Sequence, residues 1–252
     1  MELLLIHYFD PVWRRIKLRM LDWSLKNLPD FIEKISLKPS AISPEERVQL
    51  EEYLRCEVVF TVMQLCEDLA IAFETYKYST ADAVRAFRAE RKASQFMSKV
   101  NSRTKEELAD WLSIPPVENL NRHPTAVRSL TQVKEFLGRL RKFYFDYLEM
   151  YNCYKHGNRL AYISSPEDDE TPYPVVLYFP KGEERNTASL RSIGDIGPVF
   201  ELGNQIIEIS SYSKKNWLTR KRVGTSGNFA IEFPILRGHT QNSSRETETS
   251  VA

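Results

Sequence analysis

Residues 50–73, Leu50-EEYLRCEVVFTVMQLCEDLAIA-Phe73, decide the fold class of this chain. On a helix, the apolar side chains of this run would cover much of the circumference; examples are Val58, Phe60, Met63 and Leu69. Neither glycine nor proline interrupts the run. A helix that is apolar on nearly all sides is buried in a protein core. We therefore predict a central core helix, which begins at Ser43-Pro44-Glu45-Glu46 with Glu46 as the capping-box carboxylate.

Further helices are predicted on both sides of this core helix. Asp10-Pro11, followed by apolar residues at helical spacing, predicts a first helix to about Asn27. Residues 80–100 and 104–114 each begin with a capping signal and are more charged, so we expect two surface helices. All of the secondary-structure signals in the first 114 residues thus predict helices.

The longest helical pattern starts at His123-Pro124-Thr125 and ends in the stretch YNCYKHG, Tyr151 to Gly157. A last helix is predicted from Gly197-Pro198 to about Arg222, because apolar residues recur there every three or four positions. Both helices have an apolar face, so we expect them to pack in the same bundle as the core helix.

Two segments are predicted as strands by their β-branched and aromatic content, residues 173–179 and 229–233. The sequence therefore indicates a mostly α protein, with one main domain over residues 1–236 and a small β-hairpin or strand pair near the C-terminus. The β-containing insertion is placed at about 166–194 and the other strand at about 228–235. Whether the β-segment is a separate domain stays open. Residues 237–252 are almost free of apolar side chains, and we expect a disordered tail.

The composition is that of an ordinary globular protein. In 252 residues, 42% are hydrophobic and 27% charged, and the net charge is only +1, so a polyanionic partner would have to be attracted by a local patch. Three widely spaced cysteines are typical of buried free thiols in a reducing compartment. No apolar run approaches the ~20 residues of a spanning helix. We expect a cytoplasmic protein with no membrane partner.

Metal and cofactor sites are not predicted. None of the four histidines lies in an E-x-x-H or H-x-x-x-H arrangement, and no glycine-rich phosphate loop occurs. Four carboxylates of the core helix are expected to be helix-edge charges or members of salt bridges: Glu57, Glu67, Asp68 and Glu74.

The strongest candidate for chemistry is the end of the long helix. Asn152 and His156 are four residues apart and share one face, with Arg159 next along it and Lys155 on an adjoining stripe. A histidine there could act as a general base near neutral pH. The alternative is that it only caps the C-terminal carbonyls of the helix, where a cation is favoured.

This segment resembles the signature helix of the HEPN superfamily, whose motif is often Arg-Asn-x-x-x-His followed by Gly. Asn152, His156 and Gly157 match the motif, and Tyr151 stands where the family has arginine. The resemblance covers residues 125–162 and implies a helical bundle that acts as a homodimer, in a defence or toxin–antitoxin setting. It implies metal-independent RNA cleavage through the 2′-hydroxyl. His156 would be the base, Asn152 would hold it or a phosphate, and Lys155 or Arg159 would replace the arginine.

A second candidate is the basic stretch Tyr212 to Arg222, which has five cations, two aromatic residues and no carboxylate. Such a run can hold phosphates and stack a base. The alternative is a solvated helix end whose cations complement the helix dipole. The residues predicted to contact nucleic acid are Lys214, Lys215, Trp217, Arg220, Lys221 and Arg222.

Two functions therefore remain open. The first is an HEPN-like protein that binds RNA or a nucleotide, with or without ribonuclease activity. The second is a non-catalytic helical module that binds another protein through its Tyr- and Trp-rich surfaces.

Overall fold

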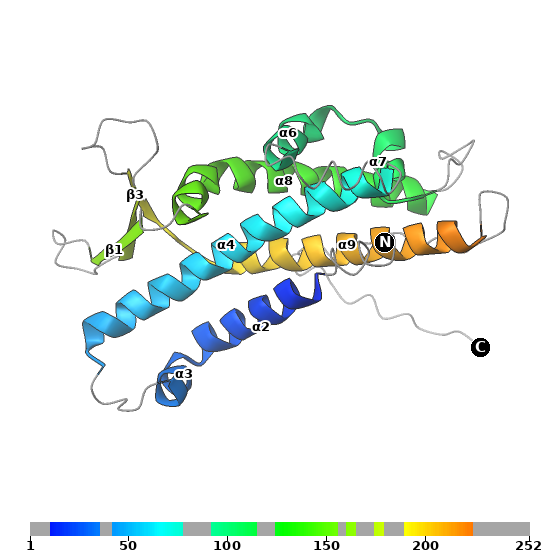
Figure 1. The fold of residues 1–252 in the computed structure, drawn as a ribbon. Coiled ribbons are helices and arrows are strands. Elements are labelled where there is room, and N and C mark those ends of the chain that lie inside the picture. The colour runs from blue at the N-terminus through cyan, green and yellow to red at the C-terminus, as the bar shows by residue number, and fades with distance from the viewer. Residues whose placement is uncertain are drawn as a thin grey trace, which may run out of the picture.

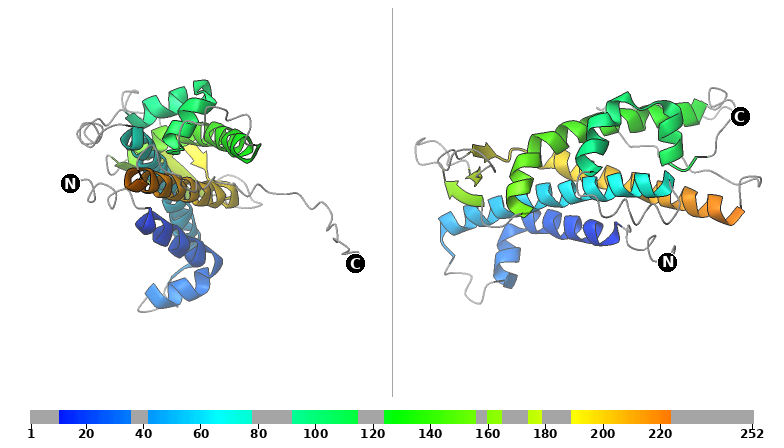
Figure 2. Two further views of the ribbon diagram at one scale, coloured as in Figure 1. Left: turned by 90° about the vertical axis from the view of Figure 1, so that its right-hand side faces the viewer. Right: turned by 45° about the horizontal axis from the view of Figure 1, so that its top comes forward.

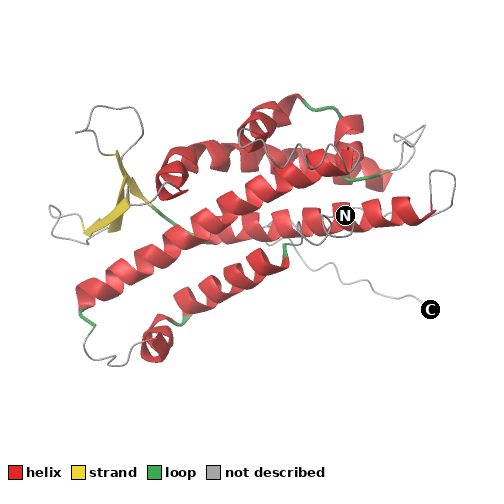
Figure 3. Ribbon diagram, viewed as in Figure 1, coloured by secondary structure: helices red, strands yellow, loops and turns green. Residues whose placement is uncertain are grey.

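The computed structural model describes residues 11–35, 42–77, 92–114, 124–155, 160–164, 174–178 and 189–223, and this part of the chain is mostly helical (Figure 1). Long helices lie side by side, and a small sheet stands at one end (Figure 3). The mostly α class predicted from the sequence is therefore confirmed. Residues 229–233 and the tail, for which a strand and disorder were predicted, lie outside the described residues.

The central element is α4, Pro44–Lys77, a helix of 34 residues that spans about 51 Å. The capping box is present at its start, because Glu46 N donates to Ser43 Oγ at 3.1 Å and Ser43 N donates to the Glu46 carboxylate at 2.7 Å. Along its middle, Val58, Phe60 and Met63 are wholly inaccessible to solvent. The prediction of a central core helix is confirmed, since α2, α8 and α9 all pack on α4.

Helices α2, Val12–Lys26, and α9, Gly197–Val223, pack on α4 and on each other. The approach is closest at Gly203 of α9, where an added Cβ would lie 2.8 Å from Leu18 of α2 and 3.0 Å from Val62 of α4. A glycine is needed here because three helices meet at one level. Asn27 interrupts the first helix, and a second short helix, α3, Leu28–Ile35, follows that the sequence did not predict.

On another face of α4 lies α8, Pro124–Lys155, which has the longest helical pattern in the sequence but whose 32 described residues are fewer than the 34 of α4. The short elements α6 (Lys92–Lys99), η2 (Val100–Ser102) and α7 (Lys105–Trp111) pack near it. Trp111 is buried and stacks on Phe73 of α4, with ring centroids 5.3 Å apart, and Phe96 lies 4.8 Å from the same indole. Residues 80–91 of the first predicted surface helix lie outside the described residues. The described parts are not confined to the surface, because both helices contribute aromatic side chains to the core.

The sheet has three antiparallel strands in the order β1-β2-β3. They are β1, Leu160–Ser164, β2, Pro174–Tyr178, and β3, Ser189–Ser192. β2 lies within the segment predicted as a strand, residues 173–179. Its edges are occupied by β1, with Tyr162 opposite Val176, and by β3, with Leu190 opposite Leu177. The sheet thus begins at residue 160, earlier than the predicted insertion, and connects the end of α8 to the start of α9.

Two further expectations concern the described part alone. Cys56, Cys66 and Cys153 are free and buried, as predicted. Among the helices that the structure describes, none is long and apolar enough to cross a membrane.

Candidate functional site

The described part of helix α8 reaches Lys155, the residue before the histidine of the motif. Asn152 and Lys155 are exposed on the last turn, whereas His156 and Arg159 lie outside the described residues. The predicted pairing of Asn152 with His156 is therefore not placed, and it stays a prediction.

Tyr151, which stands where the family has arginine, is wholly buried. Its hydroxyl donates a hydrogen bond of 3.1 Å to Glu67 Oε2, and its ring lies 6.1 Å from that of Phe60. Burial, together with the Glu67 carboxylate, raises the pKa of the Tyr151 hydroxyl far above its ordinary value. The group is therefore a neutral donor that joins α8 to α4, and it takes no cationic role.

Lys155 is held by the same carboxylate. Its Nζ lies 2.6 Å from Oε1 and 2.8 Å from Oε2 of Glu67, and 4.8 Å from the centre of the Tyr151 ring. A phosphate at Lys155 would have to compete with this ion pair. The sequence could not reveal the partner, because Glu67 lies 88 positions away along the chain.

Four carboxylates of α4 were predicted to be helix-edge charges or members of salt bridges, and three of them form salt bridges. Glu67 binds Lys155 of α8, while its neighbour Asp68 accepts from Arg14 of α2 at 3.2 Å. Further along, Glu57 accepts from Lys17 of α2 at 2.8 Å. These pairs link α2, α4 and α8. The side chain of Glu74, the fourth predicted member, lies outside the described residues.

Tyr154 completes the last turn of α8. Its ring stacks on Phe60 with centroids 4.0 Å apart. Burial and the Glu57 carboxylate raise the pKa of Tyr154 to about 12, so it too is neutral at physiological pH. The aromatic residues of the motif therefore serve to pack α8 on α4.

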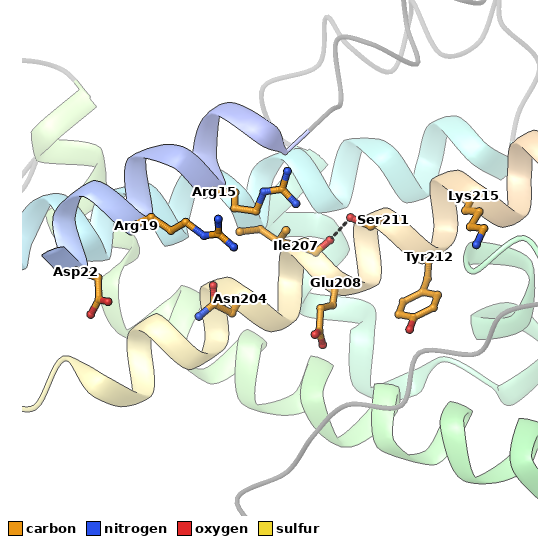
Figure 4. A pocket seen from close by; sticks show the side chains of 9 residues that line it. All are labelled: Arg15, Arg19, Asp22, Asn204, Ile207, Glu208, Ser211, Tyr212 and Lys215. Atoms are coloured by element: carbon orange, nitrogen blue, oxygen red, sulfur yellow. Dashed lines mark hydrogen bonds between the residues drawn. The ribbon is translucent and has the colours of Figure 1, made fainter.

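A groove runs between α2 and α9, on the side of α2 that carries Arg15 and Arg19 (Figure 4). Its volume is about 720 Å³. Arg15 and Arg19 extend from α2 toward α9, where the Ser211 hydroxyl donates to the Ile207 carbonyl at 2.7 Å. The residues that line it are Arg15, Arg19, Asp22, Asn204, Ile207, Glu208, Ser211, Tyr212 and Lys215.

A second hollow of about 360 Å³ continues the groove toward the C-terminal end of α9. Arg15, Ser211 and Lys215 line both hollows, and Lys214 borders the second. Four cationic side chains thus border one continuous depression. Of its two carboxylates, that of Asp22 is paired with Lys26 at 2.9 Å, which leaves Glu208 as the other acidic group.

The basic stretch predicted to contact nucleic acid is divided by this geometry. Lys214 and Lys215 border the groove, whereas Trp217 is partly buried and does not line it. The side chains of three further residues of the stretch, Arg220, Lys221 and Arg222 of α9, lie outside the described residues. The sequence did not identify Arg15 and Arg19 as candidate binding residues. The signal that could have found them is the run of cations at positions 14, 15, 17 and 19.

Within the described residues, no group of three or more His, Cys, Asp or Glu side chains is arranged to hold a metal ion. What the groove offers is a set of cationic and amide groups, with a tyrosine ring, in an open depression. Such groups can bind phosphate oxygens and stack a base.

In comparisons with known proteins, no family model, no curated protein and no solved structure matches this chain. The resemblance to the HEPN superfamily therefore rests on the sequence motif at residues 152–157.

Proposed function

We propose that this protein is an HEPN-like helical bundle that binds RNA, or a nucleotide, through its phosphates in the groove between α2 and α9. The observation that carries the proposal is the convergence of cations from distant parts of the chain. Arg15 and Arg19 of α2 border the same depression as Lys214 and Lys215 of α9. In a protein of net charge +1, such a local gathering is the kind of feature that attracts a polyanion.

Two adjacent carboxylates of α4 tie the helices of the groove and of the motif to the same core helix. Glu67 holds Lys155 of α8, and Asp68 holds Arg14 of α2, the residue before Arg15 of the groove.

For the motif itself we propose binding without rapid cleavage. Tyr151 replaces the arginine that would stabilise the charge of the transition state, and its hydroxyl is used by Glu67. Lys155, the nearest substitute, is engaged by the same carboxylate and offers a point charge rather than a planar fork.

The test is incubation of labelled single-stranded RNA with purified protein in EDTA, with retention and cleavage read on the same gel. We expect retention by the wild type, and its loss in Arg15→Ala/Arg19→Ala. The matched control is Arg128→Ala/Lys134→Ala, which removes two exposed cations of α8 that do not line the groove and should leave retention unchanged.

Three results would contradict all or part of the proposal. Equal retention by wild type and the groove variant would exclude the groove as the binding surface. Cleavage by the wild type but not by His156→Ala would establish a metal-independent ribonuclease and overturn the binding-only part. If no RNA or nucleotide is bound at all, the protein-interaction module is the better description.

A further inference from the structure

Helix α2 carries a row of exposed apolar side chains. Trp13 is 79% exposed, Ile16 41%, Met20 63% and Trp23 40%. They are separated by three, four and three residues, so they form one stripe along the helix. A contiguous exposed stripe of large apolar side chains is typical of an interaction surface, whereas apolar residues exposed singly are ordinary.

The stripe faces away from the bundle. Leu18 and Leu21 form the buried face of α2, and at roughly 100° per residue the stripe lies nearly opposite them. In both views of Figure 2, α2 lies at the edge of the bundle and α3 projects past it. The stripe and α3 thus form an elbow, where Lys34 of α3 sits 4.5 Å from the centre of the Trp23 ring.

The spacing of the stripe is the same read in either direction. Its outer members, Trp13 and Trp23, and its inner members, Ile16 and Met20, are both centred on position 18. Two copies of α2 that run antiparallel would place Trp13 opposite Trp23 of the partner subunit and Ile16 opposite Met20 of the partner subunit. We propose that a second copy of this chain docks on the stripe in this antiparallel arrangement, about a two-fold axis that passes at the level of residue 18.

The exposed apolar area agrees with such a partner. With about 150–250 Å² for a buried aromatic side chain, the exposed parts of the stripe and of Ile35 amount to roughly 1,000 Å² over two copies. That is at the small end of specific interfaces, so the dimer is concentration-dependent.

Other occupants fit less well. A bilayer is flat, whereas α3 projects beyond α2. Ile16 and Met20 offer a nucleic acid neither charge nor an aromatic face. One consequence of this dimer rests on the proposed function. Because the two-fold axis is perpendicular to α2, the edges of α2 that carry Arg15 and Arg19 lie on the same side of the pair in both copies. The two grooves would then form one basic track.

Cysteine cross-linking tests the arrangement in the absence of RNA, so that its failure is distinct from a failure of RNA binding. Ile16→Cys and Met20→Cys proteins are oxidised separately and as a mixture; the native cysteines are buried. We expect disulfide-linked dimers mainly in the mixture, because position 16 faces position 20 of the partner subunit. If each variant alone formed as much disulfide-linked dimer as the mixture, the two α2 helices would pair in parallel. If no sample formed disulfide-linked dimer, the stripe would not be the contact between the copies. Either result overturns the proposal.

Light scattering after gel filtration provides the second readout. The mass of the wild type should rise from 29.4 kDa toward twice that value with concentration. Trp13→Ala/Trp23→Ala should stay monomeric, and Phe145→Ala, which truncates an exposed aromatic residue of α8, should behave as the wild type. A wild type that stays monomeric overturns the proposal, and if it then sediments with phosphatidylserine vesicles, the stripe is a lipid-binding surface instead.

Discussion

At the scale of single residues, the most unusual group is the carboxyl of Glu52 in α4. The residue is only 1% exposed, and its carboxyl lies against the backbone of Ile193. Desolvation raises the pKa of Glu52 to about 7, although Arg55 and the Ile193 backbone both act to lower it. Burial of an ionised carboxylate is costly, so the folded state prefers the protonated form.

A pH dependence of stability follows from Glu52. Because its folded pKa is raised, the folded state holds a proton that the unfolded chain loses from about pH 4.5 upward. Its contribution to stability therefore declines as pH rises from about 4.5 to 7, by roughly 3 kcal/mol in total. We expect Glu52→Gln to match the wild type near pH 5 and to exceed it near pH 8, as measured by urea unfolding at each pH. Parallel pH profiles of the two proteins would contradict this.

The hydrogen bond from Tyr151 to Glu67 gives a second prediction. Tyr151→Phe keeps the buried ring against Phe60 but removes the donor, and it leaves Glu67 with Lys155 alone. We expect a loss of about 1 kcal/mol in the free energy of unfolding. Chemical denaturation measures it, and a variant as stable as the wild type would mean that the bond adds nothing to the joint between α8 and α4.

At the scale of elements, two helical glycines should respond to alanine in opposite ways. At Gly203 the new Cβ would press on Leu18 and on the stiff side chain of Val62, so we expect destabilisation of about 1 kcal/mol even after the gain in helix propensity. At Gly138 of α8 the nearest atom, Asn101 Oδ1, is 3.7 Å away. There Gly→Ala should stabilise by about 0.5–1 kcal/mol. Thermal unfolding of the two variants tests the pair, and equal shifts would contradict the close approach of α2, α4 and α9.

Helix positions were predictable because their signals are local. The capping boxes at Ser43 and Thr104 mark the starts of α4 and α7, and both are formed in the structure. Which face is buried depends on distant partners, so the stacking of Trp111 on Phe73 could not be foreseen. The strands β1 and β3 were missed because one directly follows the motif and the other is a short polar segment.

At the scale of the whole molecule, the sequence contained the components of the candidate groove but not their assembly. The basic stretch of α9 was visible, while Arg15 and Arg19 belonged to a helix read only for its apolar stripe. Tertiary packing of α2 on α9 brings them together, and no local pattern predicts that contact. In the same way, the distant Glu67 engages a lysine that the sequence alone offered for phosphate binding.

The salt dependence of RNA binding tests the central claim most directly, because phosphate contacts release counterions in proportion to their number. For a single strand the slope of log K against log salt is about −0.7 for each contact, so the four cations of the groove predict a slope of roughly −3 for the wild type. Fluorescence anisotropy should show this slope, made less steep by about 0.7 in Arg15→Ala. A slope near zero, or one unchanged in Arg15→Ala, would contradict the assignment of the groove between α2 and α9 as the phosphate-binding surface.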